Sequence, residues 1–502
     1  MQGLLFGRAD PPKSPPLPTL SSTPDTFRDP RAVDDFLSRE LSQLSFKDRS
    51  AINEEIHGVK CLAPEETPEL VRNSLCQLMD ELRTTRSPKD AYDQACFLFP
   101  HSYIHTDEFR LRFLRYELMN PKTAAQRIVT FLECAVELFG TQILERPIQL
   151  SDLGRDGMEM MRLGHYQCLP FRDRSGRRIL AFVGNFGLQF PVEVRLKIIY
   201  YLHWVLTDDD ESQRKGLVGV FWWPTTSGIT RNQNTVDDSE SDDPNTPVHP
   251  DGFAYMPGPR DHIVGARLFS GSPGRVAAIH ICLPDKQIFH FFRSSLALGL
   301  NATRRRIKVH TGEGLALQYA LHSYGIPVDL LPITETGNVK TKNHQRFIKV
   351  RSILEKQNTN GGAAATQDDD PIECPGLHDV VFRVGDSYLC HPGNAKFRGW
   401  IESTFEDYNA ASKDRKVAIT WLLVDEVLKT GRFLVWDKHW WVFLRDREKM
   451  RTKVIGAFKD QKRRLKATAN LQENESSTYK FTEEDGRKRK RDEESCLSKC
   501  YR

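Results

Sequence analysis

The sequence predicts an α/β fold, a sheet covered by helices, followed by a small α+β domain. Two observations predict it. Short runs rich in β-branched residues alternate with longer segments whose apolar residues recur every three or four positions, as strands and helices alternate around a covered sheet. A second pattern, helices with a hairpin, follows a linker rich in Gly, Ala and Asn. The 502 residues have room for two or three domains.

An N-terminal helical lobe is expected over residues 31–150. Its clearest helix begins after Asn120 and Pro121, which suit the N-cap and the first helical position. Apolar residues recur at helical spacing through 124–139, and Gly140 is the expected αL cap. One face of this helix must therefore pack against another element.

A sheet-forming domain is expected over 151–345. A long amphipathic helix is predicted from Pro191 to Leu206. Runs of strand length and composition lie at 179–183, 217–223, 276–282 and 307–310.

The remaining segments divide the chain further. A C-terminal unit over 377–467 has the expected order of two helices, a hairpin and a basic helix. The helices are predicted over 395–411 and 414–428, the hairpin strands over 432–436 and 440–444, and the basic helix from 448 to about 465. Expected loops and linkers are a disordered segment at 1–30, an acidic loop at 226–262, a linker at 346–376 and a polar, disordered tail at 468–502.

Composition excludes several classes of protein. The net charge of +4, from 71 basic and 67 acidic residues, gives no sign that the whole chain binds nucleic acid, so such a surface would have to be local. Ten cysteines without a C-x-x-C pair favour reduced thiols over disulfides or a zinc site. The N-terminus lacks a secretory pattern, and no apolar run is long enough to span a membrane. We expect a nuclear or cytoplasmic protein, or one found in both.

No motif indicates catalysis. The sequence 184–187, Gly-Asn-Phe-Gly, lacks the spacing of a nucleotide-binding loop and is better explained as a turn at a strand end. The stretch 270–274 does not match the G-x-S-x-G elbow of hydrolases. Histidines at 280, 290, 310 and 322 lie on different predicted elements, which favours separate core or surface positions over a metal site. We expect a non-enzymatic protein without a cofactor or metal.

An apolar stretch follows the third of these strands. Its residues fit either ordinary core or a helix that closes an apolar cavity, as lipid carriers require. The candidates for pocket lining or gate are Phe289, Phe292, Leu296 and Leu298. A basic cluster next to them fits either an anionic headgroup at a membrane surface or a solvated strand edge. The candidates for headgroup contact are Arg304, Arg305 and Lys308.

The order of these motifs resembles a CRAL-TRIO lipid-binding domain of the type found in diatoms, over about residues 90–345. The resemblance depends on Arg172 to Arg177 before a strand, on Ala277 to His280, and on Arg306 to His310. It implies an α/β domain whose sheet floors a hydrophobic pocket, with residues 285–298 as a mobile gate. A lipid or other hydrophobic small molecule and a peripheral membrane contact are the implied partners.

The C-terminal unit resembles a domain of unknown function that is common in such diatom proteins. Its motifs are His-Pro-Gly-Asn at 391–394 and Gly-Arg-Phe-Leu at 431–434, followed by two tryptophans. The candidate site residues of this domain are His391, Pro392, Gly393, Asn394, Gly431, Arg432, Phe433, Trp440 and Trp441.

Two functions remain open. The first is a non-enzymatic carrier that binds a lipid and uses 377–467 to contact a partner. The second is a nuclear regulatory protein with a ligand-free scaffold, whose domain over 377–467 binds DNA through phosphate contacts, as winged helices do. A nuclear import signal is expected at Arg487, Lys488, Arg489, Lys490 and Arg491.

Overall fold

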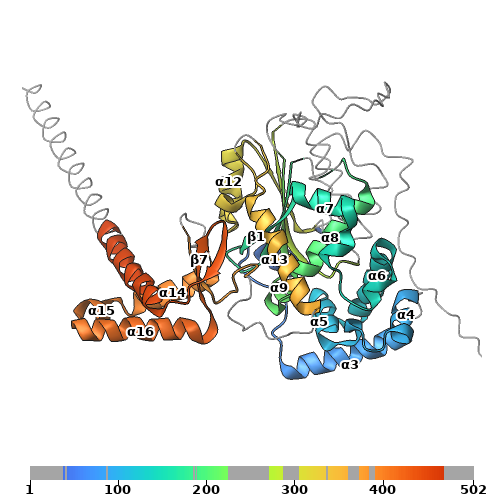
Figure 1. The fold of residues 1–502 in the computed structure, drawn as a ribbon, viewed down its shortest axis with the longest axis horizontal. Coiled ribbons are helices and arrows are strands. Elements are labelled where there is room, and N and C mark those ends of the chain that lie inside the picture. The colour runs from blue at the N-terminus through green and yellow to red at the C-terminus, as the bar shows by residue number, and fades with distance from the viewer. Residues whose placement is uncertain are drawn as a thin grey trace, which may run out of the picture.

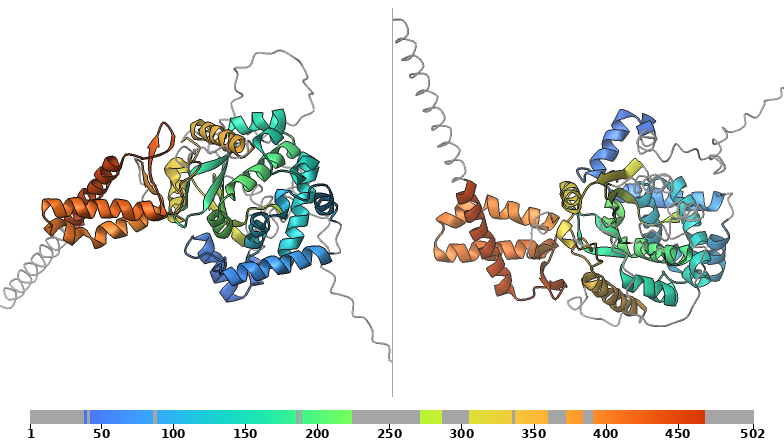
Figure 2. Two further views of the ribbon diagram at one scale, coloured as in Figure 1. Left: turned by 60° about the horizontal axis from the view of Figure 1, so that its bottom comes forward. Right: turned by 90° about the horizontal axis from the view of Figure 1, so that it is seen from above.

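A five-stranded sheet with helices on both sides forms the body of the protein, and a smaller domain projects from it (Figure 1). The fold is given by a computed structural model. It describes residues 38–39, 42–85, 89–184, 187, 189–223, 271–285, 305–334, 337–359, 372–383 and 391–468. The projecting domain contains a second, three-stranded sheet (Figure 2). The prediction of a mixed α/β fold is confirmed.

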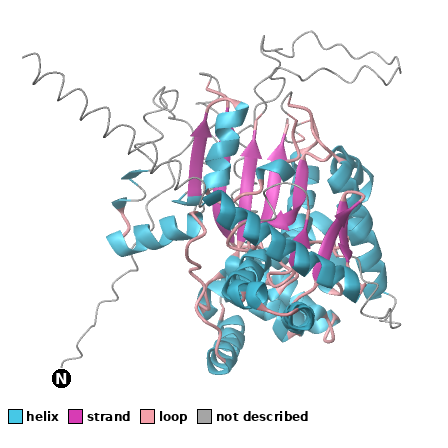
Figure 3. Cartoon of the chain, turned by 90° about the vertical axis from the view of Figure 1, so that its left-hand side faces the viewer, coloured by secondary structure: helices cyan, strands magenta, loops and turns pink. Residues whose placement is uncertain are grey.

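The large sheet has the strand order β1-β2-β3-β4-β5, and Figure 3 shows its strands side by side. Its strands are β1 (Tyr166–Arg172), β2 (Arg178–Val183), β3 (Leu217–Trp222), β4 (Val276–Leu283) and β5 (Ile307–Thr311). β1 is antiparallel to β2, and each later pair is parallel. Four strands agree with the sequence prediction. Strand β1 is not predicted, because Gln167, Pro170 and Arg172 interrupt its apolar pattern.

The helices of the N-terminal lobe are α2 (Phe46–Ile56), α3 (Pro68–Thr84), α4 (Asp90–Leu98), α5 (Asp107–Tyr116) and α6 (Pro121–Phe139). Helices α3 to α6 share a core with the first face of this sheet, whereas α2 packs on the second face. The predicted N-cap is confirmed, since Asn120 Oδ1 accepts from the backbone N–H of Thr123 at 3.3 Å. Gly140 ends α6 with φ 90° and ψ 178°, a positive φ that favours glycine but lies outside the αL region.

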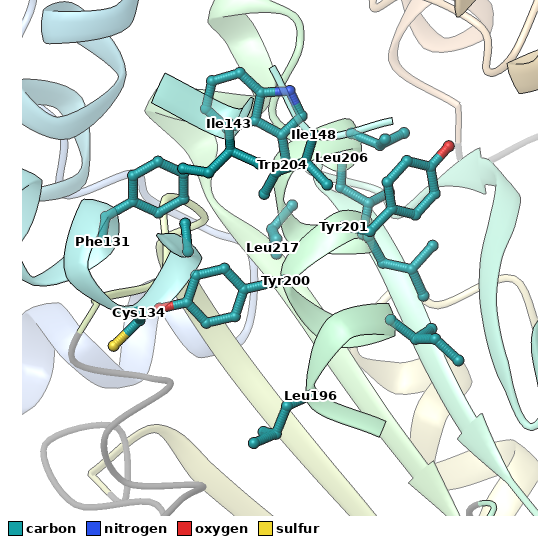
Figure 4. Packing of buried hydrophobic residues seen from close by; sticks show 14 of the residues in the cluster. Phe131, Cys134, Ile143, Ile148, Leu196, Tyr200, Tyr201, Trp204, Leu206 and Leu217 are labelled. Carbon is teal, nitrogen blue, oxygen red and sulfur yellow. The ribbon is translucent and has the colours of Figure 1, made fainter. Parts of the chain in front are cut away.

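The core beneath this face is closed by aromatic side chains. The remaining helices of the body are α7 (Gly154–Leu163), α8 (Val192–Leu206), α9 (Asp210–Lys215), α12 (Gly314–Ser323) and α13 (Lys342–Thr359). Phe131 of α6 stacks on Tyr200 and Trp204 of α8, with ring centroids 5.9 and 5.8 Å apart (Figure 4). The C-terminal half of α8 is buried on every side, so the predicted amphipathic pattern holds only for its first turns.

The second face of the sheet is covered by α2, α12 and the chain that follows α12. Leu317 and Leu321 of α12 pack with Val218 and Val220 of β3. Within the residues that the structure describes, both faces of the sheet therefore bury side chains of the protein itself.

Helix α13 occupies the first part of the segment expected as a linker. Phe347 and Val350 are buried in the main core, and the helix packs against β1. These residues recur at helical spacing, which gives the helix an apolar side for the sheet.

The C-terminal domain has the predicted order of helices, hairpin and helix. Its elements are β6 (Val380–Phe382), α14 (Pro392–Ser403), α15 (Phe405–Ala410), α16 (Lys413–Thr430), β7 (Phe433–Asp437), β8 (Trp440–Phe443) and a helix over 447–468. Strand β6 is parallel to β7, and β7 is antiparallel to β8. The first predicted helix begins earlier, at Pro392, and is divided at Thr404.

Candidate functional site

The His-Pro-Gly-Asn motif holds β6 in place. The side-chain amide of Asn394 accepts from the N–H of Val381 at 2.7 Å and donates to its carbonyl at 2.8 Å, as a neighbouring strand would. A Cβ on Gly393 would lie 2.1 Å from the carbonyl oxygen of Asp379. Only glycine permits this close approach, so these two residues have a structural role.

The Gly-Arg-Phe-Leu motif fixes the other side of β6. A Cβ on Gly431 would lie 2.1 Å from the carbonyl oxygen of His378. Arg432 donates to both carboxylate oxygens of Asp379, with Nη2 2.8 Å from Oδ2. Phe433 is fully buried in the core of the domain. The motif thus joins β6 to β7.

The two tryptophans and His391 face away from the domain core and toward the body of the protein. Trp441 Nε1 donates to the carbonyl of Pro170 in β1 at 2.5 Å, and Trp440 Nε1 donates to the carbonyl of Ile372 at 2.6 Å. The ring of His391 lies 5.3 Å from that of Phe171, also in β1, and burial lowers the pKa of His391 to about 4. The hairpin therefore packs against the body of the protein and does not project into solvent as the wing of a winged helix does.

Exposed cations of the C-terminal domain are concentrated on its last helix. Residues 377–468 contain 19 Lys and Arg and 12 Asp and Glu, a formal charge of +7. The helix over 447–468 has nine of the cations and two of the carboxylates, so it carries all of this excess. Because the whole chain carries +4, the rest of it carries −3. A local basic surface is therefore present.

This helix forms one wall of a groove of about 490 Å³. β6, α14 and β7 supply the opposite wall, with Phe382, Phe397 and Trp436 as its aromatic residues. Gly456 and Ala457 face the groove from the helix, and a Cβ on Gly456 would meet open space. Small residues at this point keep the groove open.

Four cations line the groove: Arg383, Arg398, Lys453 and Arg464. Lys453 Nζ lies 5.0 Å from the centroid of the Phe382 ring, and the Arg383 guanidinium lies 5.1 Å from that of Trp436. Among the described residues, the one carboxylate in the lining is Asp460, which is 3.2 Å from Arg463. We call these residues the basic groove. It combines cationic groups with aromatic faces, as sites that hold a phosphate backbone do.

Other predicted site residues lie elsewhere. The gate candidates Phe289, Phe292, Leu296 and Leu298, the headgroup candidate Arg304 and the import signal 487–491 lie outside the described residues. Arg305 precedes β5, and Lys308 in β5 donates to Asn53 Oδ1 at 3.1 Å.

Sequence reasoning missed a contact between two histidines. His280 of β4 and His310 of β5 lie on neighbouring parallel strands, and His280 Nδ1 is 3.1 Å from His310 Nε2. Tyr324 packs against both rings. Burial lowers the pKa of His310 to about 4. The expectation that these histidines lie apart is corrected, because sequence distance gives no sign of strand register.

The described residues hold no group of three or more His, Cys, Asp or Glu side chains arranged to bind a metal ion. Among the described helices, none combines the length and apolar character that crossing a membrane requires.

Residues 379–460 match a family whose description is Domain of unknown function (DUF6824). The match includes the His-Pro-Gly-Asn and Gly-Arg-Phe-Leu motifs, and it extends to Asp460 in the basic groove. The predicted C-terminal domain of unknown function is thereby confirmed. A search of curated proteins finds no match for the chain.

Proposed function

We propose that the C-terminal domain binds nucleic acid through phosphate contacts in the basic groove, with the N-terminal α/β domain as its scaffold. The observation that carries the proposal is that the whole excess positive charge of the domain lies on the helix that walls the groove. Lys and Arg that neutralise phosphates supply the main part of sequence-independent affinity.

Three features support this function over a purely structural role for the helix. Lys453 and Arg464 form no ion pair with any described residue, so both can neutralise a ligand. The aromatic rings beneath the cations offer stacking surfaces. A nucleic-acid partner also agrees with the nuclear location that 487–491 predicts.

The mode of contact differs from that of a winged helix. Trp440 and Trp441 attach the hairpin to the body of the protein, so the hairpin is not free to enter a groove of DNA as the wing of a winged helix does. The basic groove and the helix over 447–468 are the contact surface instead.

The test is fluorescence anisotropy with the full chain and two labelled 20-mers, duplex DNA and single-stranded DNA, between 50 and 300 mM salt. The logarithm of the binding constant should fall linearly with that of the salt concentration, by about 0.9 per duplex phosphate contacted and about 0.7 per single-strand one. Lys453→Gln with Arg464→Gln should reduce the slope by about 1.5–2 and the affinity by at least about tenfold.

A matched control distinguishes the loss of groove contacts from the loss of positive charge alone. Lys413→Gln with Arg415→Gln removes two exposed cations of the same domain, at the start of α16 and outside the groove. Its affinity should change less than about threefold. A flat response to salt, or equal losses in both double variants, would reject phosphate binding in the groove.

A second candidate function, a CRAL-TRIO-like lipid carrier, is supported by the order of the large sheet. An antiparallel edge pair leads into parallel strands in sequential order, which agrees with the α/β domain that the resemblance implies. Native mass spectrometry of the chain from eukaryotic expression, with lipid extraction, should then detect one bound lipid per chain. Recovery of no co-purifying lipid would count against the carrier.

A further inference from the structure

A second cavity lies where the N-terminal domain meets the His-Pro-Gly-Asn motif. Its volume is about 280 Å³, close to the lower end of the range for small-molecule sites. Three separate parts of the body form its walls: the chain after α2, the turn between β1 and β2, and the C-terminal end of α9. Pro392, the first residue of α14, completes the lining from the C-terminal domain.

The charges that face this cavity are unevenly compensated. Glu55 is buried and is neutralised by Arg275, with 2.8 Å between Oε1 and Nη1, and by Arg306. Arg177 is paired with Asp173.

The other three cations in the lining are Lys60, Arg174 and Lys215. Arg174 donates to the carbonyls of His57 and Ser323 at 3.3 and 3.4 Å, and Lys215 donates to the carbonyl of Ser175 at 2.9 Å. None of the three faces a carboxylate among the described residues in an ion pair. The cavity therefore has a net positive charge of about three that the described chain leaves uncompensated.

Two further observations agree with a positive potential here. The pKa of His57, which precedes the lining segment, is lowered by burial and then by the nearby cations Lys308, Arg174 and Arg177. The N-terminal end of α14 carries the positive end of the helix dipole, and Pro392 places it at the cavity wall.

We propose that this cavity binds a small, phosphate-bearing anion, with Lys60, Arg174 and Lys215 as its cationic contacts. The chemistry is that of a compact, multiply charged anion, because three cations converge on a volume too small for a polymer. This site lies apart from the basic groove, and the inference holds whether or not the groove binds nucleic acid. Since Pro392 belongs to the lining, a bound anion would also contact the docked C-terminal domain.

The experiment titrates the full chain with inorganic pyrophosphate by calorimetry at constant ionic strength, with chloride as the competing salt. A saturable site with one anion per chain is expected. Lys60→Gln with Arg174→Gln should raise the dissociation constant for pyrophosphate by at least about tenfold, since two charged contacts are lost. Lys122→Gln with Arg72→Gln, two exposed cations on α6 and α3, is the matched control and should bind as the unmodified chain does.

Hydrogen exchange locates the site independently. Pyrophosphate should slow exchange in 58–61, in 173–177 and at the start of α14, and the single variant Lys60→Glu, at an exposed position, should abolish this protection without unfolding the chain. A parallel titration with phosphatidylcholine vesicles containing phosphatidic acid shows whether the phosphate can come from a lipid. If neither probe binds saturably, or if both double variants bind equally, the site does not exist.

Discussion

The two domains use the same kind of side chain for opposite purposes. In the body of the protein, one set of arginines is buried and paired: Arg177 Nε lies 2.6 Å from Asp173 Oδ2, and the side chains are 2% and 0% exposed. Arg351 contacts both Asp208 and Glu373, at 2.9 and 3.0 Å. On the last helix of the C-terminal domain most cations are exposed, and their ion pairs are made with neighbours one turn away, with Asp425 of α16 in the case of Arg447, or with no described residue.

This difference indicates which charged side chains are available to bind a ligand. A buried pair is already satisfied, and losing either partner leaves an uncompensated charge. An exposed cation gains little from an ion pair in water and is available to a ligand. The buried, paired arginines of the body are therefore structural, whereas the exposed cations of the last helix are candidates for binding. Mutation of each class tests this distinction.

The largest expected effect comes from the buried pair. Asp173→Asn removes the charge that Arg177 requires and weakens the contacts of Asp173 with the β1–β2 turn. We expect the free energy of unfolding to fall by about 3–5 kcal/mol, measured by urea denaturation.

The control breaks an exposed pair of the other domain. Asp460→Asn separates a carboxylate from Arg463, whose side chain is 79% exposed, and should cost less than about 1 kcal/mol. Similar losses in the two variants would show that burial does not divide the charges as we infer.

The next largest effect is a dependence of the free energy of unfolding on pH, which arises from His391 at the junction of the domains. Burial lowers the pKa of His391 to about 4 in the folded protein, against about 6.5 in the unfolded chain. The unfolded chain therefore binds an extra proton between these values, so stability is full above pH 6.5 and declines as the pH falls toward 4.

Replacement of this histidine isolates its contribution, because the buried histidines of the body remain in both proteins. His391→Gln should flatten the decline between pH 6.5 and 4 by up to about 3 kcal/mol, measured by urea denaturation at several pH values. An unchanged slope in the variant would show that the junction does not hold His391 neutral.

A smaller effect is expected at the docked hairpin. Trp441→Phe removes the indole N–H that donates to Pro170, leaving a buried carbonyl unsatisfied at a cost of about 1–3 kcal/mol. Hydrogen exchange in β1 should become faster. Trp421→Phe on α16, a partly exposed position, is the control and should leave β1 unchanged. Unchanged exchange in both variants would mean that Trp441 does not hold the two domains together.

Local patterns account for the parts of the fold that the sequence predicts well. Asn120 before Pro121 marks the start of α6, and β2, β3 and β4 are nearly continuous apolar runs because both faces of their sheet are buried, whereas β5 alternates apolar and polar residues. Strand β1 is missed because it ends in Arg172, which is buried against Asp209 and the carbonyl of Pro375. Pro375 lies 203 residues from Arg172, so the neighbouring sequence does not reveal the contacts that allow an arginine in a buried strand.

The sequence indicates which residue types form the candidate site, but it does not indicate how they are arranged in space. Composition indicates the basic helix, and the motif residues stand out, yet Gly393 and Asn394 prove to support β6. The basic groove depends on Phe382 and Trp436 meeting Lys453 across the domain. Such a meeting is set by packing of β6 and β7 against the last helix, for which spacing along the chain gives no signal.

The smallest expected effect on stability is at the groove itself. Lys453→Gln with Arg464→Gln should change the free energy of unfolding by less than about 1 kcal/mol, because both side chains are exposed and, among the described residues, the side-chain contact given up is that of Lys453 over the Phe382 ring. Urea denaturation beside Asp173→Asn makes the comparison direct. A loss of several kcal/mol would place these cations with the structural arginines of the body. A small loss, together with weakened binding to DNA, would show that the domain keeps them for a ligand, since a charge that does not stabilise the fold has to be explained by what it contacts outside it.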